Sequence, residues 1–90
     1  MRFEWDPNKA RRNLLEHGVS FDEALTAFWD PLSITVFDDG HSEREDRFVL
    51  IGATLRFRLV VVVHTVRGDG LRIISARLAT RRERRDYANL

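Results

Sequence analysis

The residues best suited to chemistry lie near the C-terminal end, where residues 73–87 read IISARLATRRERRDY. Thr80 and Glu83 match the Ser/Thr-x-x-Glu box that caps a helix start. Arg81 and Arg82 would then occupy the first helical turn, where the macrodipole is already positive and a cation costs about 0.3 to 1 kcal/mol. A bound anion relieves that conflict, because free backbone N–H groups and arginines bind phosphate together. We therefore predict a phosphate-contacting site that consists of arginines at this helix start: Arg81, Arg82, Arg84 and Arg85.

His64 and Arg77 lie on the two predicted strands that precede this helix. His64 is the one histidine inside a predicted strand, and an imidazole near its ordinary pKa is the usual general acid or base. The pattern fits equally well a half-buried histidine that is bonded to a backbone carbonyl. If the hairpin between the two strands turns at Gly68 and Asp69, His64 and Arg77 share the sheet face that the last helix borders. A register slip of one residue would turn a strand over.

Tyr87 and Lys9 complete the candidate catalytic set. Tyr87 would either stack on a base or donate a proton, or else pack in the core, whereas Glu83 is better explained as the capping partner of Thr80 than as a base. Lys9 lies early in the first predicted helix and is an outside candidate, provided that the fold places it near the sheet rim. The three histidines have no metal-binding spacing and cysteine is absent, so we predict no metal site and no cofactor.

The remaining pattern predicts the elements that position these residues. Residues 1–5 suit a short edge strand, and helices follow from Asp6-Pro7 to His17 and from Ser20 to Asp30. Strands are predicted at residues 33–37, 47–51, 55–65 and 71–78, with a turn at residues 52–54, and the last helix begins after Thr80. The order β-α-α-β-β-β-β-α predicts one α+β domain over residues 1–90, with two N-terminal helices and a C-terminal helix around a mostly antiparallel sheet of four or five strands. We expect the helices to cover one face of that sheet.

Charge is distributed unevenly along the chain. The net charge is +1, but residues 1–46 hold eleven acids and five bases, whereas residues 47–90 hold three acids and ten bases. This asymmetry favours a polyanionic partner for the C-terminal half, although the two halves could also neutralise each other. The longest apolar run, residues 59–63, is far shorter than the roughly 20 residues that span a bilayer. We expect a cytoplasmic protein without a membrane partner.

Five stretches of the sequence together resemble the BrnT family of ribonuclease toxins. They are FEWDPNKARRN, HGVSFDEA, RFVLIG, VVVHT and RIISARLATRRERRDY, at residues 3–13, 17–24, 47–52, 61–65 and 72–87. The resemblance implies a fold similar to RelE-type ribonucleases, inhibition by a BrnA-type antitoxin, and contact with promoter DNA only through the antitoxin complex. It does not supply an acid–base pair, and Glu16 stands where the family frequently has a basic residue, so no cationic role is transferred to that position.

Together, the residues and the resemblance predict a metal-independent endoribonuclease. Such cleavage needs a base for the 2′-hydroxyl, an acid for the leaving 5′-oxygen and cations for the charge on the phosphate. We assign His64 as the base or acid and Arg77 and Arg81 as phosphate stabilisers, with Arg84 as support and Tyr87 as a stacking or proton-donating group. The alternative is a non-catalytic basic module that binds an acidic protein or a nucleic acid.

Overall fold

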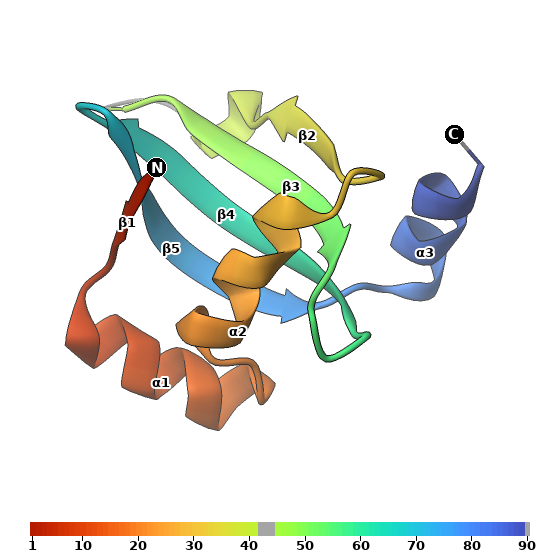
Figure 1. Cartoon of the computed structure of the whole chain (residues 1–90), viewed down its shortest axis with the longest axis horizontal. Coiled ribbons are helices and arrows are strands. Elements are labelled where there is room, and N and C mark those ends of the chain that lie inside the picture. The colour runs from red at the N-terminus through yellow and green to blue at the C-terminus, as the bar shows by residue number, and fades with distance from the viewer. Residues whose placement is uncertain (42–44, 90) are drawn as a thin grey trace.

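The computed structural model describes residues 1–41 and 45–89, and its elements follow the predicted order (Figure 1). The strands are β1 (Arg2–Glu4), β2 (Ile34–Phe37), β3 (Arg47–Ala53), β4 (Leu59–Arg67) and β5 (Gly70–Leu78). The helices are α1 (Pro7–His17), α2 (Phe21–Leu25) and α3 (Arg81–Ala88), with short 3₁₀ turns η1 (Thr26–Trp29) and η2 (Asp39–His41). The predicted α+β class, with two N-terminal helices and one C-terminal helix, is confirmed.

The strands form a five-stranded sheet in the order β1-β5-β4-β3-β2. β1 pairs with β5 in parallel, and the other neighbours pair antiparallel, so the predicted mostly antiparallel sheet is confirmed. β1 approaches β5 so closely at Gly70 that a Cβ atom there would lie 2.4 Å from the carbonyl oxygen of Arg2. A glycine is therefore required where the N-terminal strand joins the sheet.

Helices cover both faces of the sheet, which corrects the expectation that they share one. On the first face, α1, α2 and η1 pack over the main core, whose strand residues are Leu50, Val60, Val62, Ile73 and Ala76. We call this the helical face. On the second face, α3 covers a smaller cluster at one end, formed by Leu59, Val61 and Ala79 with Val49, Ile51, Ala53 and Tyr87. We call this the open face. Figure 1 shows α3 well apart from α1 and α2.

The turn between β3 and β4 lies later than predicted. Gly52 suggested a break at residues 52–54, but β3 continues to Ala53 and the turn spans residues 54–58. At Gly52 a Cβ atom would lie 3.0 Å from the carbonyl oxygen of Ala27. This glycine therefore allows η1 to pack closely on the strand and does not mark a turn.

Asn13 fixes α1 against the edge of the sheet. Its buried amide donates to the carbonyl oxygens of Ala76 at 2.7 Å and Val19 at 2.9 Å, and accepts from the Ala76 N–H at 3.1 Å. β1 pairs with β5 only as far as Arg72, so the Asn13 side chain satisfies backbone groups of β5 that no strand reaches. Buried peptide groups need such partners.

Glu23 connects α2 to the β3–β4 turn. Ser20 caps α2 as predicted, accepting from the Glu23 N–H at 3.0 Å. Ser20 and Glu23 have the spacing of a capping box. The Glu23 carboxylate does not complete the box but accepts from Arg58 Nε at 2.9 Å and from Thr54 Oγ1 at 2.8 Å. The hydrogen bonds with Arg58 and Thr54 lower the pKa of this 6% exposed carboxyl below its ordinary value.

Candidate nucleic-acid interface

A β-bulge places His64 and Arg77 on opposite faces of the sheet. In the β4–β5 register Val63 pairs with Ser75 but His64 pairs with Ile73, so one residue of β5 is extra at this point. Arg77 pairs with Val61 and therefore lies on the open face, whereas His64 aligns with Ile73 on the helical face. The expectation that the two side chains reach one site is wrong, because the bulge changes the alternation within β5.

His64 lies in an aromatic environment on the helical face. The residue is 4% exposed, and its ring centroid lies 4.8 Å from that of Phe28 and 5.9 Å from that of Phe48. Its Nδ1 lies 3.2 Å from the carbonyl oxygen of Val62. Burial lowers the pKa of His64 below its ordinary value, against a smaller opposing effect of this carbonyl. These contacts match the alternative of a buried histidine bonded to a backbone carbonyl.

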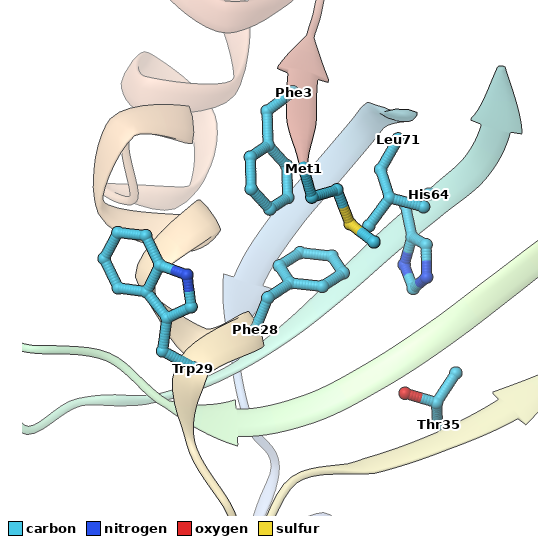
Figure 2. Close-up of a pocket in the computed structure, with 7 residues that line it drawn as sticks. All are labelled: Met1, Phe3, Phe28, Trp29, Thr35, His64 and Leu71. Atoms are coloured by element: carbon cyan, nitrogen blue, oxygen red, sulfur yellow. The ribbon is translucent and has the colours of Figure 1, made fainter. Parts of the chain in front are cut away.

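His64 also lines a hollow of about 550 Å³. Figure 2 shows its lining side chains, which are Met1, Phe3, Phe28, Trp29, Thr35, His64 and Leu71. Among the described residues, no arginine or lysine lines it. A catalytic role for His64 stays a prediction, but none of these lining residues has a guanidinium or ammonium side chain to stabilise a phosphate.

Arg77 is held by Glu83 on the open face. The guanidinium donates to both oxygens of the carboxylate, at 2.8 and 2.9 Å, and one of these oxygens also accepts from the Thr80 N–H at 2.8 Å. The predicted capping box of Thr80 and Glu83 is present. Arg77 and the cap lower the pKa of Glu83 to about 2, so this carboxylate stays ionised near neutral pH and is unsuited to act as a base. One side chain thus both caps α3 and anchors Arg77.

The arginines of α3 are exposed and have no ion-pair partner in the described part of the chain. Arg81, Arg82, Arg84 and Arg85 are all exposed, and none forms an ion pair with a residue in the described ranges 1–41 and 45–89. The sequence also predicts that some of these arginines pair with Asp86 and with the acidic N-terminal half. That prediction is wrong for the described residues, among which no such pair forms.

Tyr87 attaches α3 to the sheet. Its hydroxyl donates to Asp30 Oδ2 at 2.5 Å, and the same oxygen accepts from the Ala53 N–H at 2.8 Å. This hydrogen bond, together with burial, raises the pKa of Tyr87 to about 12. The ring packs against the smaller core cluster. The core-packing alternative for Tyr87 therefore fits its surroundings, and its hydroxyl is far from titrating near neutral pH.

Lys9 lies at a different place. It lines a shallow pocket of about 210 Å³ between α1 and the outer edge of β5, together with Arg12, Asn13, Glu16, His17, Ile74 and Ser75. Neither Arg77 nor any residue of α3 lines this pocket. The sequence-predicted candidates are thus divided: Arg77, Tyr87 and the α3 arginines lie together, whereas His64 and Lys9 lie elsewhere.

Further arginines on the open face were missed by the sequence analysis. The register places Arg47, Arg67 and Arg72 on the same face as Arg77. Arg72 pairs with Glu4 at 3.1 Å, and Arg67 lies 3.8 Å from Glu45. The alternation of side chains along β3 and β4 could have identified Arg47 and Arg67. Arg72 lies before the bulge in β5, so its face could not be assigned relative to Arg77 until the bulge was known.

The fold and this surface define a small α+β protein with a cluster of exposed arginines at one end of its sheet, a distribution suited to polyanions. The chain belongs to the BrnT family: the family model described as the ribonuclease toxin, BrnT, of type II toxin–antitoxin systems matches residues 5–83.

A solved structure has the same fold. It is the 1.1 Å crystal structure of the Brucella abortus ribonuclease toxin BrnT, with a TM-score of 0.61 and 23% sequence identity, covering 90% of this chain and 99% of that one. No match was found among curated proteins. Within the described residues, no helix is both long and apolar enough to span a bilayer.

Proposed function

We propose that the protein is the toxin of a type II toxin–antitoxin module and cleaves RNA without a metal ion, using the α3 end of the open face to hold the substrate's phosphates. The observation that carries this proposal is a group of four exposed arginines without an ion-pair partner among the described residues, Arg81, Arg82, Arg84 and Arg85. They lie on a helix that Glu83 and Tyr87 fix to the sheet. Membership of a ribonuclease toxin family supports it independently.

The chemistry suits guanidinium groups. Attack of a 2′-hydroxyl on the adjacent phosphate needs no external nucleophile, breaks the bond to the 5′-oxygen and leaves a 2′,3′-cyclic phosphate. The phosphate gains negative charge in the transition state, and positioned cations stabilise that charge more than they stabilise the ground state. We assign this role to Arg81, with Arg84 as support, and expect Arg82 and Arg85 to extend the contact along the RNA backbone.

The groups around α3 are poorly suited to proton transfer. Around α3, Glu83 has a pKa near 2 and Tyr87 a pKa near 12, so neither of these two groups exchanges a proton readily near pH 7. We therefore expect charge stabilisation and positioning to supply most of the rate. His64 and Lys9 remain candidate proton-transfer groups that lie away from this surface.

The test is incubation of the purified protein with an end-labelled RNA in EDTA, with analysis of both fragments and ends. Fragments that carry 2′,3′-cyclic phosphate in the presence of chelator are expected. Replacing Arg81 and Arg82 together by Ala should slow cleavage by about tenfold for each arginine, the effect of about 1.4 kcal/mol of lost stabilisation. Arg11→Ala is the matched control, because Arg11 is an exposed helical arginine on α1.

Two outcomes would count against the proposal. Cleavage that disappears in EDTA and returns with a divalent cation would exclude metal independence. Equal cleavage by the Arg81/Arg82 variant and by Arg11→Ala would exclude α3 as the phosphate-binding surface. His64→Ala and Lys9→Ala in the same assay measure whether either distant group contributes.

The alternative, a non-catalytic basic module, uses the same arginines and is favoured by the pKa values of Glu83 and Tyr87. A measurement of turnover distinguishes this module from a ribonuclease, because an enzyme cleaves RNA in molar excess over itself whereas a binder forms stoichiometric complexes. For binding to single strands, log affinity decreases with log salt concentration, and the steepness of that decrease should be smaller by about 0.7 for each phosphate contact that is removed.

The partners follow from the same proposal. We infer that a BrnA-type antitoxin neutralises the protein in the cytoplasm and that promoter DNA is contacted only through the toxin–antitoxin complex. An antitoxin that covers the α3 arginines with acidic groups would compete directly with RNA, so adding it should displace a bound RNA. The similarity to RelE-type ribonucleases stays a prediction.

A further inference from the structure

The tip of the β3–β4 hairpin presents an aromatic ring to solvent. Phe57 is 95% exposed, and its backbone has a φ of 64°. Its neighbour Arg56 has a side chain that is 76% exposed. Figure 1 shows this hairpin at the end of the sheet from which the chain runs into α3. An exposed ring is common enough alone, but here it coincides with an unfavourable backbone conformation.

The turn geometry explains why phenylalanine is a poor choice for this position. The Thr54 N–H donates to the Arg58 carbonyl at 2.8 Å, and the Phe57 N–H donates to the Thr54 carbonyl at 2.9 Å. Hairpin loops of this kind end in a residue with left-handed backbone conformation, which glycine or asparagine adopts readily. A bulky residue at positive φ is strained, and such strain points to a function when the surrounding structure enforces it.

The base of the turn is held firmly. Thr54 Oγ1 accepts from the N–H groups of Arg56 and Arg58 at 3.2 and 3.3 Å, and donates to the buried Glu23. The Leu55 N–H donates to Thr26 Oγ1 at 2.9 Å. The turn is thus bonded to α2 and η1, and the ring projects from a backbone that these hydrogen bonds hold in place. A turn that is already ordered loses less conformational entropy on binding than a mobile one.

The surroundings of the ring are cationic. Arg58 and Arg56 share one carboxylate, Glu23, with Arg56 at 3.9 Å, which leaves one positive charge in excess. The Ala79 N–H donates to the Leu59 carbonyl at 2.9 Å, so the chain enters α3 from beside the start of β4. The hairpin tip and the α3 arginines therefore lie at the same end of the sheet.

We propose that Phe57 is the platform on which a nucleobase of single-stranded RNA stacks while the RNA phosphates contact the α3 arginines. This proposal rests on the proposed function and adds the position of a base. A single ring among guanidinium groups is typical of single-strand recognition, where a flat aromatic face accepts a base and cations follow the backbone. The excess positive charge beside the ring favours a polyanion over an apolar protein surface as its partner.

The decisive variant is Phe57→Gly, because it removes the ring and relieves the backbone strain together. We expect its thermal midpoint to equal or exceed that of the wild type. Its affinity for a fluorescent, uncleavable 2′-O-methyl oligoribonucleotide should fall by roughly 5- to 140-fold, the effect of about 1 to 3 kcal/mol for one stacked base. Phe57→Trp should retain the affinity. Leu15→Ala, which alters an 87% exposed apolar residue on α1, is the control and should not change it.

An oligonucleotide with abasic positions tests stacking directly. Removal of the bases should weaken binding to the wild type but leave binding to Phe57→Gly nearly unchanged. Equal affinity of the wild type and Phe57→Gly for the base-containing probe would overturn the stacking role while leaving the proposed nuclease intact. Failure of the wild type to bind or cleave any RNA would overturn both. Loss of antitoxin binding in Phe57→Gly with unaltered RNA affinity would overturn the proposal in favour of a protein-docking role.

Discussion

Glu83 is the residue whose perturbation tests most directly how the cationic helix is held. Its carboxylate caps α3 through the Thr80 N–H and binds Arg77 through both oxygens. The substitution Glu83→Gln keeps the shape of the side chain and removes its charge. We expect it to lower the free energy of unfolding at neutral pH and to loosen α3 on the sheet.

The magnitude follows from the pKa of this carboxyl. Its lowering from 4.5 to about 2 corresponds to roughly 3 kcal/mol at about 1.4 kcal/mol for each pKa unit. The Arg77 side chain is 43% exposed, and water and salt therefore screen the pair. We expect about 1 to 2 kcal/mol of stability from this interaction at neutral pH.

The pH dependence has a definite sign. The folded state lowers the pKa of this acid, so the stabilisation is fully present above about 4.5 and is lost as the pH falls towards 2. Urea denaturation of the wild type and of Glu83→Gln between these values is the assay. The difference between the two proteins should shrink towards zero at the acidic end.

Asp86→Asn provides the control for helix charge, since Asp86 is an exposed acid on the same helix. A stability difference between the wild type and Glu83→Gln that stays constant from neutral pH to pH 2 would refute the reasoning. It would show that the charge of Glu83 contributes little and that amide and carboxylate differ for another reason.

Other contacts give further predictions. Asn13→Ala should cost about 2 to 4 kcal/mol in urea denaturation, because it leaves buried backbone groups of β5 without partners; an unchanged midpoint would contradict this. Tyr87→Phe should cost about 1 to 2 kcal/mol by removing a hydrogen bond to Asp30. Because folding raises the pKa of Tyr87 from 10 to about 12, that cost should be constant below pH 10 and vanish as the pH rises through 12; a cost that persists unchanged above pH 12 would exclude the hydrogen bond as its origin.

Local signals were sufficient to predict much of the fold. Asp6 caps α1 and Gly18 ends it with a φ of 69°, and Thr80 with Glu83 begins α3 as the sequence indicates. These features depend on residues within one or two helical turns. The sequence of helices and strands along the chain followed from local patterns in the same way, with a sheet of four or five strands predicted and five observed.

The candidate site could be predicted only in part, because its geometry depends on contacts between distant segments. No local pattern in residues 71–78 reveals the bulge that turns Arg77 away from His64. Asn13 resembles any polar residue in a helix until Ala76, far away in the sequence, is placed beside it. Phe57 looked like a strand residue, since its role depends on where the turn falls.

The pairing of Arg77 with Glu83 also distinguishes this arginine from those on α3. A phosphate that approached Arg77 would meet a carboxylate held 2.8 to 2.9 Å from the same guanidinium, and like charges would oppose each other there. We therefore expect Arg77 to act mainly through Glu83, by fixing the start of α3, whereas Arg81 and Arg82, which have no ion-pair partner among the described residues, are available to an anion. The positive charge at the helix start, which is unfavourable in the free protein, would become favourable with a phosphate bound. On the proposed function, the fold retains an electrostatic cost that binding of a polyanion would relieve.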